Sequence, residues 1–434
     1  MELTQIYGAY QSSIKNGATV DMTEIETAFR EAALRGGSML LSKLLSEIPE
    51  TAPDCGKCGE KMRNLDRREK QLVTLLGNCV YWRNYYGCDC GEHSIPKDEL
   101  LEVSGTGYTQ SVKRVTAQVS VSDSFRDTSA TLKMLCGIEV NVKDAERMAE
   151  GVGSCILEKR QEEIKYSLEE LNPPKPETPI KTMYIEYDGT GVPMRKSELE
   201  GRKGKQVDGS GKTREMKTGC IFTQSGVDDE GKPIRDADST TYFSHIGELE
   251  EFSQLLYSES VKRGVDYAER VVVLGDGAKW IWSLATNNFP DALQIIDLYH
   301  AKEHIFDLLR SLIADVKLMH LYKDGLYTML ENGDIARLVD VFSNLPAETE
   351  DQKEKIETES NYFMTNKDRM QYQDFHKQGL FVGSGVIEAA CKNVIGKRLK
   401  QSGMLWSVDG ANKMAALRCF VLSGGFVPNF MCCL

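Results

Sequence analysis

Two apolar stretches that end in Asp-Gly decide the fold: residues 182–189 read TMYIEYDG and residues 270–277 read RVVVLGDG. Short apolar runs of this kind, rich in β-branched and aromatic residues and closed by a turn signal, predict buried strands. Three further runs predict strands in the same way: 218–226 (TGCIFTQSG), 239–247 (STTYFSHIG) and 293–300 (LQIIDLYH). The sequence between 182 and 300 therefore predicts a sheet.

Helical patterns separate and follow these strands. One amphipathic pattern, at 251–264, precedes the second Asp-Gly strand, and another, at 278–289, follows it. Residues 301 to about 380 are almost wholly helical in pattern, and a last helix begins near Gly385. This order of strands and helices matches an α/β fold, a ribonuclease-H-like core that is interrupted by an all-helical insertion.

Four cysteines frame a predicted hairpin in the N-terminal third of the chain. Alternating apolar residues on either side of Gly77-Asn78 predict its two antiparallel strands. Four thiolates at such a hairpin suit tetrahedral zinc, so we expect a zinc-ribbon-like module with one structural zinc ion. The second cysteine pair has a one-residue gap where two residues are usual, so His93 or Cys79 is an alternative ligand, and free thiols are the other interpretation. The expected zinc ligands are Cys55, Cys58, Cys88 and Cys90.

Changes in composition mark the expected segments of a chain that is too long for one ordinary domain. A polar, proline-rich stretch at 171–181 cannot continue a helix and predicts the main boundary. Before it, three helical patterns with Ser124 and Asn141 as N-cap residues resemble a helix-turn-helix. We expect an N-terminal helical segment (1–50), a zinc-ribbon-like module (51–100), a helix-turn-helix-like, DNA-binding helical region (101–171), a linker (172–180), the first part of the core (181–300), a helical insertion (301–382), and the final core helix with a C-terminal tail (383–434).

Composition indicates a globular protein that is basic only locally. The 434 residues are 41% hydrophobic and 27% charged, with a net charge of −12. The sequence has no apolar run near the roughly 20 residues that span a bilayer and no secretory pattern, so we expect a cytoplasmic protein with reduced thiols and no membrane partner. The acidic balance argues against indiscriminate nucleic-acid binding, but Lys and Arg predominate at 195–217 and 392–418.

Three acidic residues are candidate metal ligands. Asp188 and Asp276 each end an apolar run and precede glycine, which predicts a place at the sheet edge where open α/β proteins hold ligands. Glu388 is expected in the first turn of a helix, where its carboxylate can point toward the same cleft. Carboxylates suit two magnesium ions, which can activate an attacking oxygen and stabilise a leaving one at phosphorus. The alternative for each aspartate is an ordinary Asp-Gly turn.

Six segments in the second half of the chain stand out as a set. They are YDGTGVP (187–193), REMKTGCIF (214–222), GDGAKWIW (275–282), IIDLYHAKEH (295–304), GSGVIEAACKNVIGKRLKQSGMLW (383–406) and DGANKMAALRC (409–419). In this order they resemble the diagnostic segments of Kra-type bacterial insertion-sequence transposases, which belong to the Mutator-like DDE group. The resemblance implies a DDE transposase whose catalytic, magnesium-binding acids are Asp188, Asp276 and Glu388. It also implies double-stranded DNA, both transposon ends and target, as partner, and a homodimer or larger synaptic assembly.

Other residues are candidates for accessory roles and for DNA binding. Asp297 and His300 resemble the Asp-x-x-His signature of that group, although a lone histidine in an apolar strand is more often structural. Trp406 lies in a basic stretch and is a candidate for stacking on a base, with burial as the alternative. Trp280 and Trp282 are expected in the core. The DNA-binding candidates are Lys392, Lys397, Arg398, Lys400 and Trp406.

Three other functions share some of these patterns. A haloacid-dehalogenase-like phosphatase needs a nucleophilic aspartate two residues before Asp188, where this chain has Glu186. It also needs another aspartate shortly after Asp276, and none is there. An actin-like sugar kinase explains neither Glu388 nor the cysteines. The non-enzymatic alternative is a domesticated transposase that acts only as a sequence-specific DNA-binding protein.

Overall fold

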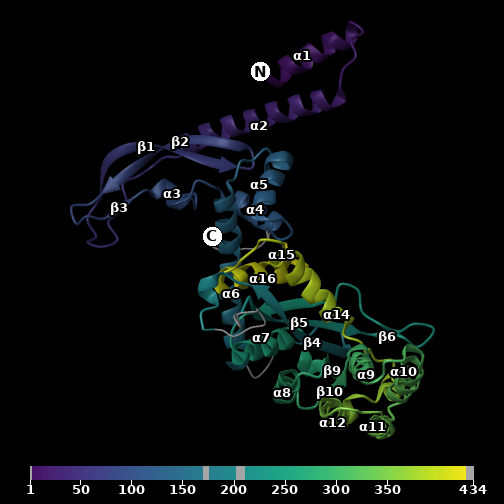
Figure 1. Cartoon of the computed structure of the whole chain (residues 1–434). Coiled ribbons are helices and arrows are strands. Elements are labelled where there is room, and N and C mark those ends of the chain that lie inside the picture. The colour runs from purple at the N-terminus through teal and green to yellow at the C-terminus, as the bar shows by residue number, and fades with distance from the viewer. Residues whose placement is uncertain (1, 170–174, 202–210, 427–434) are drawn as a thin grey trace. The chain divides into compact units, whose positions relative to one another are not determined.

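The computed structural model describes residues 2–169, 175–201 and 211–426, and Figure 1 labels its elements. The chain forms two compact units, one up to Val152 and one over Gly153–Phe426. Parts of the expected linker (172–174), basic stretch (202–210) and tail (427–434) lie outside the described residues. Among the helices that are described, none is both long and apolar enough to cross a membrane.

The predicted hairpin forms in the first unit. Strand β1 (Arg63–Thr74) pairs antiparallel with β2 (Gly77–Gly87), and β2 pairs with the short β3 (His93–Ser94). The turn is not at Gly77-Asn78 as predicted, because Thr74 pairs with Gly77. Instead Leu75 and Leu76 form the loop, where the Leu76 N–H donates to the Thr74 hydroxyl at 3.1 Å.

Two helices of the first unit begin at the polar caps that the sequence predicts. The Ser124 hydroxyl accepts the N–H of Asp127 at 3.2 Å, and the Asn141 side chain accepts the N–H of Asp144 at 2.9 Å. Both predicted N-caps are therefore confirmed. The helices are α1 (Glu2–Lys15), α2 (Met22–Glu47), α3 (Pro96–Leu100), α4 (Gln110–Ser120), α5 (Phe125–Thr131), the π-helical turn η1 (Leu132–Cys136) and α6 (Val142–Glu169), within which the boundary between the units falls.

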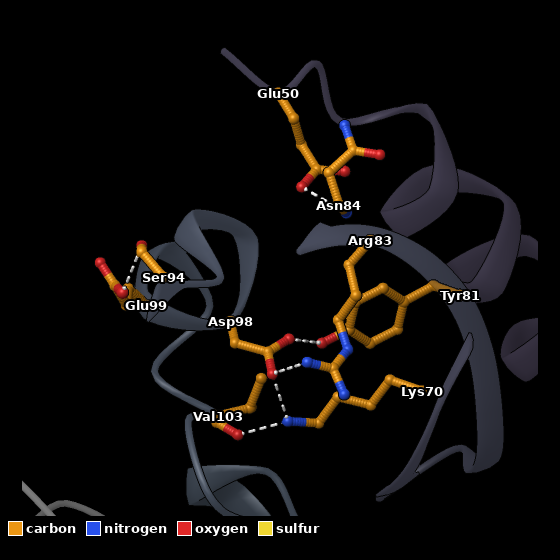
Figure 2. Close-up of polar contacts among 9 residues, drawn as sticks. All are labelled: Glu50, Lys70, Tyr81, Arg83, Asn84, Ser94, Asp98, Glu99 and Val103. Carbon is orange, nitrogen blue, oxygen red and sulfur yellow. Dashed lines mark hydrogen bonds and ion pairs between the residues drawn. The ribbon is translucent and has the colours of Figure 1, made fainter. Parts of the chain in front are cut away.

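A buried network of charges joins α3 to the hairpin (Figure 2). The carboxylate of Asp98, only 3% exposed, accepts hydrogen bonds from Lys70 Nζ and Tyr81 Oη, each at 2.9 Å. Arg83 donates to the same carboxylate at 2.7 Å. Because a buried charge without its partner is costly, the two cations need this carboxylate to remain in the interior. The network therefore fixes α3 to the strands.

The second unit contains a mixed five-stranded sheet with the order β10-β9-β4-β5-β8. Strands β9 and β10 run parallel to β4, whereas β5 is antiparallel to β4 and to β8. The central strand is buried on both faces from Thr182 to Tyr187, which explains its unbroken apolar pattern. The strands are β4 (Ile180–Pro193), β5 (Thr213–Gln224), β8 (Thr241–His245), β9 (Ala268–Gly275) and β10 (Leu293–Ile296), with a separate pair β6 (Gly226–Val227) and β7 (Pro233–Ile234).

Strand β4 does not end at Asp188, contrary to the prediction. Its pairing with β9 ends at Glu186, but its pairing with β5 continues to Pro193. The antiparallel partner supplies the hydrogen bonds that carry the strand beyond the Asp-Gly pair. Asp188 therefore lies inside a long strand, two positions beyond Glu186, the last residue that pairs with β9. At Asp188 the strand still pairs with β5.

Strand β10 ends earlier than the sequence predicts. It stops at Ile296, because the Asp297 side chain accepts the N–H of His300 at 2.6 Å and so begins helix α9 (Leu298–Leu312). Asp297 and His300 are therefore at a helix N-terminus and not in a strand.

The helical insertion shares its core with the sheet. Phe342, Phe363 and Tyr372 of the insertion belong to the same buried cluster as the strand residues. The final predicted helix is interrupted by a π-helical turn. The remaining helices are η2 (Lys196–Glu198), α7 (Leu249–Lys262), η3 (Val265–Tyr267), α8 (Lys279–Asn288), α10 (Val316–Glu331), α11 (Ile335–Ser343), α12 (Glu350–Thr365), η4 (Lys367–Arg369), α13 (Tyr372–Lys377), α14 (Gly385–Ala390), the π-helical η5 (Cys391–Gly396), α15 (Lys397–Leu399) and α16 (Val408–Leu422).

Candidate functional site

Side chains from β4, α9 and α14 and from the end of β9 meet at a cavity of about 120 Å³. Because β4 and β9 run parallel, Asp188 and the residue after β9, Asp276, reach the same edge of the sheet. Glu388 comes from the first turn of α14, as the sequence predicts. The structure thus brings the three predicted acids and His300 together. The lining residues are Tyr187, Asp188, Gly275, Asp276, Tyr299, His300, Glu303, Ser384, Ile387 and Glu388.

Asp188 is partly buried at the cavity. Burial raises the pKa of its carboxyl, and the nearby charge of Asp276 raises it further, while the N–H of Gly189, at 2.6 Å, opposes this. The S–H of Cys391 donates to its other oxygen at 3.8 Å. Because the charge of Asp276 disfavours ionisation of Asp188, the cavity favours a bound cation, which would remove this repulsion.

Asp276 is held by the turn that follows β9. Its carboxylate accepts the N–H of Ala278 at 2.8 Å. The residue between them, Gly277, leaves room for the ring of Tyr362 from the insertion: a Cβ at Gly277 would lie 2.2 Å from the Tyr362 ring. The glycine of this Asp-Gly pair therefore allows Tyr362 to pack closely beside Asp276.

Two other buried acids hold the start of α14. The carboxylate of Glu186 accepts the N–H of Ile387 at 2.9 Å, and that of Asp297 accepts the N–H of Ser384. Free N–H groups at a helix start need such acceptors. Glu388 itself is exposed, and both bonds hold backbone N–H groups that precede it at the start of α14.

Glu186 is the acid that sequence reasoning missed as a site residue. It is fully buried, and this burial raises the pKa of its carboxyl to about 8. The S–H of Cys220 donates to it at 3.9 Å. The available signal was an acidic residue in an otherwise apolar strand, on the same face as Asp188 because the two are two positions apart.

His300 has a second histidine beside it. Its Nε2 lies 3.3 Å from Nε2 of His304, whose Nδ1 lies 2.8 Å from Glu359 of α12. Tyr362 stacks on His304 with ring centroids 4.2 Å apart. A histidine four residues after another on one helix face was the available signal for His304, whereas nothing in the sequence pointed to Glu359 or Tyr362.

The predicted DNA-binding residues divide into exposed and buried ones. Lys392, Lys397 and Lys400 are exposed on the segment after Glu388. The structure contradicts the prediction for the other two. Arg398 is fully buried over the Trp406 ring, 5.4 Å from its centroid, and the indole N–H of Trp406 donates to a backbone carbonyl at 3.0 Å. Both therefore belong to the interior. Trp282 is buried in the core and Trp280 packs partly buried against it, as the sequence predicts for both.

The four predicted zinc ligands converge in the first unit. Their Sγ atoms lie within 4.8 Å of one another, with Cys55 and Cys90 3.5 Å apart and Cys58 and Cys88 3.4 Å apart. Cys55 and Cys58 lie in one tight turn, which Gly59 closes. Cys88 and Cys90 lie in another, which Gly91 closes, and both glycines have positive φ. In the described chain no other three potential ligands approach one another as closely. The sulfur set fits a tetrahedral zinc site despite its one-residue gap.

The alternative ligands lie elsewhere. The S–H of Cys79 donates to the carbonyl of Ser38 at 3.5 Å, and His93 Nδ1 contacts the carbonyl of Gly91 at 3.0 Å. Backbone N–H groups of Cys58 and Lys57 lower the pKa of the Cys55 thiol to about 7, which favours the thiolate that binds metal.

A family model for an uncharacterised protein family, UPF0236, matches residues 14–429. The chain belongs to the UPF0236 family. Two UPF0236 relatives from Caldanaerobacter subterraneus subsp. tengcongensis are each 23% identical over 436 residues, covering 98% of this chain and 82% or 77% of the relative. A Drosophila P element transposase strand transfer complex is a weak structural match, with a TM-score of 0.25, 10% identity, and coverage of 72% of this chain and 79% of that chain.

Membership of the UPF0236 family does not identify the chemistry of the site. The family assignment is also broader than the expected resemblance to Kra-type transposases. The chain offers two separate sets of potential metal ligands: hard carboxylates at the cavity in the second unit and soft thiolates in the first.

Proposed function

We propose that this UPF0236 protein is a DDE transposase that cuts insertion-sequence ends and joins them to target DNA. The observation that carries the proposal is the convergence of Asp188, Asp276 and Glu388 on one cavity at the sheet edge. Acidic oxygens gathered from separate elements at one cavity suit magnesium and a phosphodiester.

The order of strands supports the same proposal. Three antiparallel strands followed by two parallel ones, in the order β10-β9-β4-β5-β8, agree with the ribonuclease-H-like core that the resemblance to Kra-type transposases implies. The helical insertion enters between β10 and the helix of Glu388, where the sequence predicts it.

Asp188 and Asp276 would hold the magnesium ions, and Glu388, exposed at the cavity, would complete the second site with phosphate. Bound magnesium supplies charge for activating the attacking oxygen and for stabilising the leaving one. The chain's own residues prepare the site, because Glu186 and Asp297 fix the backbone at the start of α14.

DNA is the proposed partner, bound by a homodimer or a larger assembly. Lys392, Lys397 and Lys400 are exposed directly after Glu388, so they can neutralise phosphates beside the cavity. Zinc held by the four cysteines would keep the hairpin rigid, and the hairpin and the helix-turn-helix-like region would help to recognise the ends.

The test is magnesium-dependent cleavage of DNA that carries the element's own ends. The wild type should cut, Asp276→Asn should bind the ends but lose roughly 100-fold or more in rate, and Asp291→Asn, which changes an exposed aspartate away from the cavity, should cut normally. Binding without cleavage by the wild type would favour the DNA-binding regulator instead. Equal cleavage by Asp276→Asn would refute the metal assignment.

A further inference from the structure

Three side chains form a hydrogen-bonded chain that starts in the insertion and ends at the cavity. Glu359 of α12 contacts Nδ1 of His304 at 2.8 Å, and Nε2 of His304 contacts Nε2 of His300 at 3.3 Å. His300 lines the cavity with the three acids, whereas Glu359 does not. The insertion thus reaches the site through two imidazole rings.

The partners determine where the protons lie. A carboxylate only accepts, so Nδ1 of His304 carries the hydrogen of the bond to Glu359. The Nε2 of a neutral His304 is then an acceptor, and His300 must donate to it from its own Nε2. Nδ1 of His300 is left with a lone pair. It lies 3.7 Å from Oε2 of Glu303, and both His300 and Glu303 line the cavity.

Packing prevents the rings from turning. The His304 ring lies nearly parallel to the Tyr362 ring, at an angle of 10° and a centroid distance of 4.2 Å. Tyr362 in turn lies against Gly277, beside Asp276. His300 meets His304 edge-on, at 80°. A flipped His304 would have to break its contact with Glu359, so the stack and the hydrogen bond select one arrangement.

We propose that Glu359 and His304 are positioning residues that hold His300 in its Nε2–H tautomer, with Nδ1 free to accept a hydrogen bond from the nucleophile. A neutral acceptor cannot bind a phosphate oxygen, which has no hydrogen to donate, but it can orient a water molecule or a 3'-hydroxyl. This role rests on the proposed function, and it gives the helical insertion a task at the site.

The first experiment reads the tautomers and needs no activity. Ring ¹⁵N NMR of the full chain, free of magnesium, resolves six histidines, with His300→Gln and His304→Gln to assign the pair. The expected spectrum shows His304 protonated at Nδ1 and His300 protonated at Nε2. Protonation of His304 at Nε2 alone would overturn the proposal.

A matched pair of variants on α12 tests the cause. In Glu359→Gln the side-chain amide can donate as well as accept, so both rings should become tautomer mixtures, and end cleavage should slow about 10-fold with end binding unchanged. Glu357→Gln, at an exposed position of the same helix, should change neither readout. Unchanged tautomers in a folded Glu359→Gln would refute the role of Glu359. If the wild type shows the fixed tautomers and no cleavage, the proposed function fails and the tautomer assignment stands.

Discussion

The carboxylate of Glu186 accepts the backbone N–H of Ile387 at 2.9 Å, so a buried acid of the central strand holds the turn that carries Glu388. Asp297 holds the same turn through the N–H of Ser384. The third acid of the cavity is therefore placed by two others that are not among its lining residues. This relationship leads to the first prediction.

Glu186 should make the stability of the magnesium-free protein depend on pH. The pKa of its carboxyl is about 8 in the folded chain and about 4.5 when exposed, so between these values the unfolded chain holds fewer protons. Stability should be full below about pH 4.5 and fall as pH rises to about 8, by on the order of 3–5 kcal/mol. Urea unfolding followed by tryptophan fluorescence measures this, because three of the four tryptophans lie in the second unit.

Glu186→Gln should flatten that dependence between pH 5 and pH 8. Glu269→Gln, at an exposed position on β9, provides the control and should keep the wild-type slope. An equal slope in Glu186→Gln and wild type would show that the carboxyl titrates normally.

Gly277→Ala should disturb both stability and cleavage. The new Cβ would lie 2.2 Å from the Tyr362 ring, so the ring and the His304 stacked on it must move. We expect a cost of about 1–3 kcal/mol, as in other overpacked sites. The double variant Gly277→Ala, Tyr362→Ala should be more stable than the sum of the single effects predicts, because the clash is then absent. Strict additivity in urea unfolding would contradict the contact.

Cys58→Ser should release zinc from the first unit. The purified wild type should contain one zinc ion per chain by elemental analysis, and the variant much less, since one of four ligands is lost. Hydrogen exchange in β1 and β2 should rise in the variant. Cys136→Ser, in the same unit and outside the cluster, should retain zinc. Equal zinc in both variants would exclude this site.

Asp98→Ala should lower the free energy of unfolding of the first unit. It leaves Lys70 and Arg83 without their carboxylate in the interior, at a cost of about 3–5 kcal/mol. Glu99→Ala, which removes the side chain of an exposed residue that contacts Ser94, should cost less than about 1 kcal/mol (Figure 2). Similar urea midpoints for the two variants would show that the network of Asp98 adds little.

The sequence predicts what depends on local pattern. The strands around Asp188 and Asp276, the first-turn position of Glu388, and the N-caps Ser124 and Asn141 all follow from apolar periodicity and capping chemistry. Strand ends were less predictable: β4 runs past Asp188 because a partner strand extends it, which no local pattern contains.

Long-range contacts explain the remaining errors. Trp406 and Arg398 lie in a basic stretch that suggests a surface, but they stack on each other in the interior. Glu359 and Tyr362 reach His304 only because the insertion folds back on the sheet core. Pairings of this kind depend on tertiary packing and cannot be derived from spacing alone.

The bond between Glu186 and Ile387 joins residues 201 positions apart. A chain growing on the ribosome therefore has Asp188 and Asp276 long before the turn with Glu388 emerges, and both holding acids lack their partners until then. On the proposed function, a nascent or terminated chain that ends between Asp276 and Glu388 carries two of the three acids. Such a chain cannot yet cut the DNA that encodes it.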